Sequence, residues 1–322
     1  MIWLSWRQFR GQAIVALVAL GVTSAALITL GTTIRQDPYV RCTENCASLA
    51  AEFQDKWVNL LYFVDAGLLV LPVLIGIFWG APLVAREWEA GTHRLVWNQS
   101  VTRARWLTVK LLVVGAGCVA VSSVFSLLLT WAASPYDEVA GDRFTRLLFG
   151  VRNLAPVGYA VFAFTLGACL GLLLRRTVRT MALAGLVLIV VQILVPTLLR
   201  PHYLTPENRA VPMTAEVVAN LRFLGSDADI SGLTVPGAMV VSTSRILGPS
   251  GGLVDLDRYH ACVSRSPETA PACIAALGAH VDVAYHPASR YWLFQLLELA
   301  LYLVAAALLA TVSALRLRRG GQ

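Results

Sequence analysis

The sequence predicts an all-α membrane protein with six transmembrane helices, both termini cytoplasmic, and a small external domain between the fifth and sixth helices. Three observations support this prediction. Of the 322 residues, 57% are hydrophobic and only 14% are charged, whereas a soluble domain usually carries about a quarter charged residues. Six apolar runs are long enough to span the hydrocarbon layer, which takes roughly 20 residues. The basic residues are also distributed unevenly among the segments between these runs.

Each apolar run is predicted to be one helix, because backbone polar groups in lipid must bond to one another. Four runs contain no Asp, Glu, Lys or Arg: 11–34, 111–136, 153–174 and 180–199. The other two, 57–85 and 291–315, contain one acid each, Asp65 and Glu298. The first run exceeds the roughly 7–15 residues of a signal-peptide core, so we expect it to be a helix of the mature protein. No barrel-like alternation is present.

The distribution of charge predicts the orientation. With the N-terminus inside, the inner segments carry 13 basic residues against two acids, Glu87 and Glu89, and the outer segments carry 13 basic residues against 15 acids. An excess of Lys and Arg in short loops marks the cytoplasmic side of membrane proteins. The net charge of +7 is therefore interpreted as a topological signal, and no nucleic-acid partner is expected.

The sequence predicts three regions along the chain. Residues 1–199 hold the first five helices and the cytoplasmic segment 86–110, with short outer loops expected at 35–56 and 137–152. Pro, Gly, Asp and His occur throughout residues 200–290, and no run there is long enough to span, so this region is predicted to be the extracytoplasmic domain with mixed short elements. Residues 291–322 are the sixth helix and a basic cytoplasmic tail.

Four of the six cysteines fall on the predicted outer side: Cys42, Cys46, Cys262 and Cys273. An oxidising surface favours disulfides, and four cysteines allow three pairings. We favour Cys42–Cys46 and Cys262–Cys273, because short loops close easily. A thiol-redox site would need a C-x-x-C arrangement, but the spacings are C-x3-C and C-x10-C. The other two cysteines fall within apolar runs and are expected to be inert packing residues.

Segment 86–110 carries most of the functional information. On a helix, Trp88, Leu95 and Trp97 share an apolar side while charged residues such as Glu87 and Glu89 stay in water, which indicates an amphipathic helix along the inner membrane surface. One interpretation is a loop whose arginines only hold it inside. The other is a docking element for a cytoplasmic partner, because Trp and Arg are enriched in protein interfaces.

The same segment resembles the region after the second helix of type-2 ABC transporter permeases. That pattern is an acid, Gly-Thr, Leu, a small-polar-basic turn, and Lys at the start of the third helix. The matching residues are Glu87 or Glu89, Gly91, Thr92, Leu95, Val101, Arg103 and Lys110. The stretches W-L-S-W-R-Q-F-R (3–10) and Y-H-P-A-S-R-Y-W-L-F-Q (285–295) also resemble actinobacterial permeases of this kind, with His286 where Gln is expected.

The resemblance implies an ABC exporter subunit in a bacterial plasma membrane. Two permease copies, as a homodimer, would enclose a pathway for an amphipathic or hydrophobic substrate. Each inner segment would be a coupling helix seated in one of two cytoplasmic ABC ATPase subunits, which would bind ATP and Mg. This chain has no G-x-x-x-x-G-K-[ST] phosphate loop, so we expect no catalytic residue and no cofactor of its own. The implied coupling residues are Glu87, Trp88, Glu89, Gly91, Thr92, Arg94 and Leu95.

Asp65 and Glu298 are candidate pathway residues, because ionisable groups within a membrane usually face a cavity or a partner. The alternative is structural, with each acid bonded to a neighbouring helix. Arg152 and Arg290 are the basic residues expected near enough to pair with them.

Two other function classes stay open in the sequence. An envelope sensor or assembly protein would bind a ligand or partner through its external domain. A membrane enzyme would need a catalytic constellation, but neither H-E-x-x-H nor G-x-S-x-G occurs. The group His280, Asp282 and His286 matches the spacing of no familiar metal site, so no metal is expected.

Overall fold

The structure is a computed structural model, and it describes residues 2–43, 46–91, 102–141, 143–266 and 268–319. Within these residues six helices are long and apolar enough to cross a membrane. The predicted class, a mostly helical six-span membrane protein with a small sheet region, is therefore confirmed. The side on which the termini lie stays a prediction.

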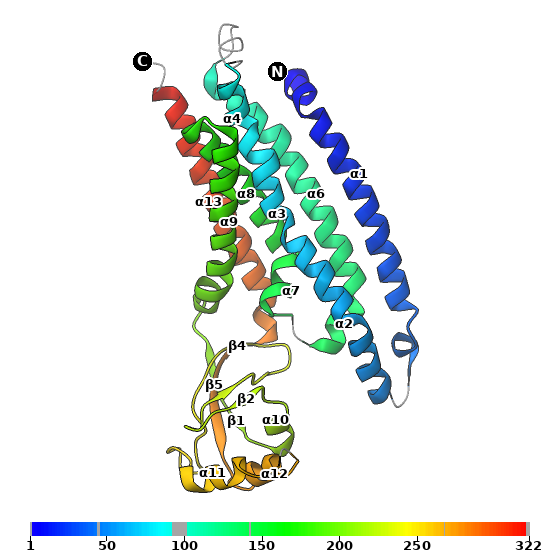
Figure 1. The fold of residues 1–322 in the computed structure, drawn as a ribbon, viewed down its shortest axis with the longest axis vertical. Helices are drawn as coiled ribbons and strands as arrows, with labels where there is room; N and C mark the ends of the chain where they lie inside the picture. Colours follow the sequence, from blue (N-terminus) through cyan, green and yellow to red (C-terminus); the bar gives the residue numbers. More distant parts are fainter. Residues whose placement is uncertain (1, 44–45, 92–101, 142, 267, 320–322) are drawn as a thin grey trace. The chain divides into compact units, whose positions relative to one another are not determined.

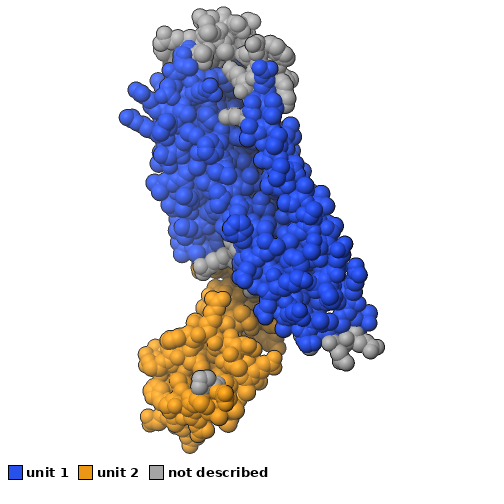
Figure 2. Space-filling view, turned by 45° about the vertical axis from the view of Figure 1, so that its right-hand side comes forward, with its two compact units in different colours: residues 1–140, 145–200, 292–322 blue, residues 141–144, 201–291 orange. Residues whose placement is uncertain are grey.

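The chain divides into two compact units, coloured separately in Figure 2. Unit 1 comprises residues 1–140, 145–200 and 292–322, and unit 2 comprises residues 141–144 and 201–291. Figure 1 shows unit 1 as a bundle of long helices. These are α1 (Ile2–Arg35), α2 (Ala47–Leu69), α6 (Arg103–Ala140), α8 (Ala155–Leu174), α9 (Thr177–Leu194) and α13 (Tyr291–Arg319).

Shorter elements complete unit 1. They are the 3-10 turn η1 (Pro38–Arg41), the helices α3 (Leu71–Ile75), α4 (Ala81–Glu89) and α7 (Arg146–Val151), and the π-helical turns η2 (Gly76–Gly80) and η3 (Val195–Leu199). The 3-10 turn η4 (Arg200–His202) begins at the last residue of this part of unit 1 and continues into unit 2. The second span, Ser48–Glu89, thus runs through four elements. Pro72 and Pro82 lie at its breaks, because proline lacks the N–H that a continuous helix needs.

Helix α8 is the centre of unit 1. In its most apolar stretch 72% of the residues are buried, compared with 11–44% in the corresponding stretches of the other five spans. It meets the second span at glycine: a Cβ on Gly167 would lie 2.4 Å from Gly76 O and 2.7 Å from Ala81 N. The two backbones therefore touch directly, and only glycine permits this approach.

Two outer loops differ in extent from the prediction. Helix α2 begins at Ala47 and α6 continues to Ala140, while α7 forms within the predicted loop 137–152. An apolar run marks only the part of a helix that suits lipid, whereas polar residues such as Glu52 and Glu138 extend the same helices beyond it. The favoured disulfides are confirmed, with S–S distances of 2.08 Å for Cys42–Cys46 and 1.97 Å for Cys262–Cys273.

Unit 2 contains a three-stranded antiparallel sheet in the order β1-β5-β4, from β1 (Glu207–Pro212), β4 (Met239–Thr243) and β5 (His280–His286). A second pair joins β2 (Phe223–Leu224) to β3 (Ile230–Ser231), and the helices are α10 (Ala215–Ala219), α11 (Leu256–Val263) and α12 (Ala270–Ala275). The side chains in the first half of strand β5 alternate between the core and the surface, with Val281 and Val283 in the core. Tyr259 joins them, its hydroxyl donating to Gly225 O at 2.9 Å.

His286, at the end of β5, is fully buried. Its Nε2 lies 3.1 Å from Pro201 O, and Arg290 Nη1 lies 3.2 Å from its Nδ1. Burial lowers the pKa of His286, and although the bond to Pro201 opposes this, the nearby Arg290 charge adds to it. The unfolded chain therefore binds the proton more tightly than the folded chain does.

The stability of the protein is expected to be full above a pH of about 6.5, the unfolded value, and to fall as the pH drops from there towards the lower folded pKa. His286→Gln, which retains a donor and an acceptor, should flatten this part of the stability curve. Thermal unfolding of the purified chain between pH 7.5 and 5.5 checks it, with His280→Gln as the control. Equal pH dependence in the wild type and His286→Gln would contradict the assignment.

Candidate functional site

Unit 1 carries charged and polar side chains in two clusters, one towards each end of its helices. The α4 cluster comprises Glu87, Trp88, Glu89, Lys110, Arg175 and Thr177. The α7 cluster comprises Asp65, Asp137, Arg152, Arg200, Gln295 and Glu298.

An ion pair between Glu87, in the last turn of α4, and Lys110, near the start of α6, lies within the α4 cluster. Glu87 is only 8% exposed and Lys110 only 4%. The Lys110 ammonium also lies 4.8 Å from the centre of the Trp106 ring. Breaking a buried pair is costly because it leaves an uncompensated charge. The helices before and after segment 90–102 are therefore fastened together.

Glu89 fastens α4 to a third helix, α9. Its Oε2 accepts hydrogen bonds from the backbone N–H of Thr177 at 3.1 Å and from the Thr177 hydroxyl at 2.7 Å. The first N–H groups of a helix have no partner within it, so a carboxylate from α4 caps α9. The Arg175 guanidinium lies 4.3 Å from the centre of the Trp88 ring, a cation–π contact. The turn between α8 and α9 is thus held against the last turn of α4.

The structure brings three of the predicted coupling residues, Glu87, Trp88 and Glu89, into this cluster. Gly91, with φ of +70°, follows the end of α4, where glycine takes the left-handed conformation without strain. The others, Thr92, Arg94 and Leu95, lie outside the described residues, as does the apolar side expected beyond Trp88. The expectation that Glu87 stays in water is wrong, because its partner Lys110 lies on the buried side of α6.

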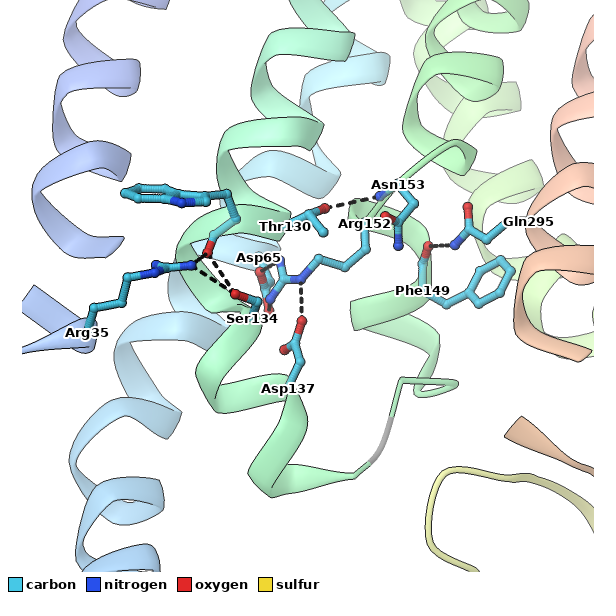
Figure 3. A network of polar contacts seen from close by, with 10 residues as sticks. Arg35, Asp65, Thr130, Ser134, Asp137, Phe149, Arg152, Asn153 and Gln295 are labelled. Carbon is cyan, nitrogen blue, oxygen red and sulfur yellow. Dashed lines mark hydrogen bonds and ion pairs between the residues drawn. The ribbon is translucent and has the colours of Figure 1, made fainter. Parts of the chain in front are cut away.

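Arg152 is at the centre of the α7 cluster, as Figure 3 shows. Its Nη1 lies 2.6 Å from Asp65 Oδ1 of α2, and its Nε lies 3.1 Å from Asp137 Oδ2 of α6. Burial disfavours the guanidinium charge, but Asp137 and Asp65 outweigh this and raise the pKa of Arg152. One arginine after α7 therefore joins the second and third spans.

A second arginine, Arg200, bonds Glu298 of α13 through two hydrogen bonds of 2.9 Å each. Its guanidinium also lies 4.1 Å from the centre of the Phe149 ring of α7. A fork of this kind is the strongest carboxylate contact that arginine makes. The end of the fifth span is thereby tied to the sixth span and to α7.

Gln295 of α13 completes the α7 cluster. Its Oε1 accepts from the N–H groups of Leu154 and Ala155 at 3.1 Å and 2.9 Å, which caps α8. Its Nε2 donates to Phe149 O at 3.2 Å. Every polar atom of this amide thus bonds to the backbone around the α7–α8 junction.

The two intramembrane acids are buried and pair with arginines, with Asp65 0% exposed and Glu298 2% exposed, and their role in a pathway stays a prediction. Asp65 pairs with Arg152, one of the two partners expected. Glu298 pairs instead with Arg200, a partner that was not predicted although it directly follows the fifth apolar run. The expectation for Arg290 is wrong, because Arg290 Nη2 bonds Glu207 Oε1 at 2.8 Å within unit 2.

A family model described as "ABC-2 membrane transporter related" matches residues 13–200, more than half of the chain. The protein belongs to this ABC-2 membrane transporter-related family. No curated protein and no solved structure matches the chain. The match confirms the resemblance to type-2 ABC permeases, while the actinobacterial detail stays a prediction.

As an ABC-2 family protein, the chain is a multi-pass membrane transport component, and permeases of this family typically work with an ATPase subunit. The matched region contains five of the six spans and the whole α4 cluster. It also contains the α7 cluster except for Gln295 and Glu298. The fastened ends of α4, α6 and α9 are thus part of the region that defines the family.

Proposed function

We propose that this permease is the membrane subunit of an ATP-driven exporter, and that segment 86–110 couples it to a separate ATPase subunit. The observation that carries the proposal is the fastening of α4, α6 and α9 at the ends of that segment. Trp88, Glu89, Gly91, Thr92, Arg94 and Leu95 form the coupling surface, while Glu87 acts from inside by holding Lys110.

A coupling element must transmit force, so its ends have to be stiff. The ion pair of Glu87 with Lys110 links α4 to α6, and the bonds of Glu89 to Thr177 link α4 to α9. Movement of the segment therefore displaces three spans together. A loop that served only to hold the chain inside would not need a buried ion pair at its base.

Energy for transport comes from the partner in this proposal. Since the chain carries no phosphate-binding loop, ATP and Mg bind to two ATPase subunits, one on each copy of a permease homodimer. Both charged networks of the bundle are internally paired, which leaves mainly apolar surface along the spans. This surface favours an amphipathic or hydrophobic substrate, moved outward across a bacterial plasma membrane.

Lys110→Met should uncouple the complex. The tagged full chain is isolated from its native membrane with the bound ATPase and placed in nanodiscs, where substrate-stimulated ATP turnover is measured. Turnover per mole of isolated complex is expected to fall about tenfold, equivalent to 1.4 kcal/mol, in addition to the loss of folded protein that the broken buried pair causes. The double variant Glu87→Met/Lys110→Met, which leaves no unpaired charge, should recover part of the turnover.

Arg258→Met is the matched control, because Arg258 is 77% exposed in its ion pair with Asp255, which is itself 57% exposed. It should leave turnover unchanged. The proposal fails if no ATPase is isolated with the chain, or if residues 92–99 can be replaced by a Gly-Ser linker without loss of coupled turnover.

A further inference from the structure

The chain enters and leaves the main part of unit 2, residues 201–291, through two segments that a buried histidine joins. His286, the last residue of β5, is 0% exposed. Its Nε2 lies 3.1 Å from Pro201 O in the entering segment, and its Nδ1 lies 3.2 Å from Nη1 of Arg290 in the leaving segment. Arg290 belongs to the 3-10 turn η5 (Ala288–Arg290). The imidazole ring therefore links the two segments directly.

These two contacts permit only one protonation state of the ring. A carbonyl oxygen accepts hydrogen bonds and cannot donate them, so Nε2 carries a proton and donates it to Pro201 O. Arginine has five donors and no acceptor, so Nδ1 must lack a proton in order to accept from Arg290. His286 is therefore neutral in this arrangement, with its single ring proton on Nε2.

The Arg290 guanidinium extends the link to the start of β1. Its Nη1, the same atom that donates to His286, also donates to Thr205 O at 2.8 Å, and its Nη2 bonds Glu207 Oε1 at 2.8 Å. A proton on Nδ1 of His286 would place two donors and two positive charges against each other at 3.2 Å. Nη1 would have to move away, and its bond to Thr205 would be lost together with its contact to the ring.

The described elements around His286 carry several other charged or imidazole side chains. They are Arg290 of η5, Glu207 of β1, and Arg200 and His202 of η4. Arg200 is neutralised by Glu298, and β4, which pairs with β5 at His286, has no titratable side chain. Burial and the Arg290 charge lower the pKa of His286, against the opposing effects of the Pro201 bond and Glu207. The ring is therefore neutral at neutral pH, and a second proton enters only under acid conditions.

We propose that His286 and Arg290 form an acid-sensitive latch, in which protonation of His286 at Nδ1 expels Arg290 and releases the entering segment 201–207 from the leaving segment 286–290. The core of unit 2 stays folded when the latch opens, because it rests on other contacts, such as the packing of Val281 with Tyr259 and the disulfide Cys262–Cys273. This inference is independent of the proposed coupling to an ATPase. It gives the protein a local response to acidification on the side of the membrane that unit 2 faces.

The test is hydrogen exchange of the full chain in nanodiscs, measured by mass spectrometry from neutral to acid pH, with each rate divided by that of an unstructured peptide at the same pH. Peptides that cover 201–208 and 285–290 should lose protection together, about tenfold for each pH unit below the folded pKa, because one proton controls both. A peptide that covers α11 should keep its protection. His286→Gln retains a donor and an acceptor but does not titrate in this range, so it should abolish the response.

Glu207→Gln and His280→Gln are the controls, since each removes another titratable group of β1 or β5, and both should keep the wild-type response. Different midpoints for the two peptides in the wild type would exclude the latch, and this result needs no variant. The latch is also excluded if His286→Gln responds to pH as the wild type does, or if α11 loses protection at the same midpoint, which would mean global unfolding. Loss of the response in Glu207→Gln would assign the proton to that carboxylate instead.

Discussion

Replacing Arg152 by Met is expected to destabilise the bundle by about 3–5 kcal/mol, the cost of removing one partner from a buried ion pair. The variant leaves Asp65 fully buried and Asp137 mostly buried, two carboxylates that repel each other without the guanidinium between them. It also removes the ion pairs that join the α7–α8 junction to α2 and α6. The loss of stability is measured by thermal unfolding of the full chain in detergent, with the fraction of protein that stays monodisperse as the readout.

Arg258→Met provides the comparison, because both side chains of the Arg258–Asp255 pair are exposed, at 77% and 57%. An exposed pair contributes about 0–1 kcal/mol, so this variant should be nearly as stable as the wild type. Adding Asp65→Leu and Asp137→Leu to Arg152→Met should restore much of the stability, since it removes the unpaired charges. If Arg152→Met is no more harmful than Arg258→Met, the buried pairs do not stabilise the bundle.

The six spans were predictable because each depends on local composition. A run such as 180–199 contains no charged residue, and that alone predicts a helix that spans the membrane. Length beyond the run was not predictable in the same way: α6 continues through Asp137 and Glu138, where the helix leaves the apolar layer. The π-helical turns η2 and η3 likewise depend on how a proline-interrupted span packs against α8 and α9.

The site was less predictable, since its contacts join distant parts of the chain. Arg200 and Glu298 are 98 residues apart, and nothing in their local sequence marks them as partners. Glu87 was expected in water because it lies among charged residues, yet the approach of α6 places Lys110 against it. The disulfides were predictable for the opposite reason, because their partners are 4 and 11 residues apart.

The two clusters hold different sets of helices together. The α7 cluster connects α2, α6, α7, α13 and the end of the fifth span through Arg152, Arg200 and their acids. The α4 cluster connects α4, α6, the turn after α8 and the start of α9. Between them the second span and α8 are joined by backbone contact at glycines. The glycine contact is therefore one route by which a displacement at α4 can reach the other end, and α6, which carries both Lys110 and Asp137, is a second.

Gly167→Ala is expected to destabilise the protein by about 3 kcal/mol, the upper end of the usual cost of overpacking a core. The new Cβ would lie 2.4 Å from Gly76 O and 2.7 Å from Ala81 N, which are backbone atoms that cannot rotate away. The second span must then move off α8, and α4 moves with it. Coupled ATP turnover should consequently fall further than the loss of folded protein explains, when both are measured on the same preparation in nanodiscs.

The matched control is the same substitution at Gly67 of α2, where no atom lies within 4 Å of the added Cβ. There the lower backbone entropy of alanine should stabilise the helix, by about 0.5–1 kcal/mol. Opposite signs at two transmembrane glycines would show that the contact with η2, and not helix propensity, sets the effect at Gly167. Equal stabilisation at both positions would mean that α8 and the second span have room to separate without cost, and the route from α4 to the α7 cluster would have to run through α6 instead.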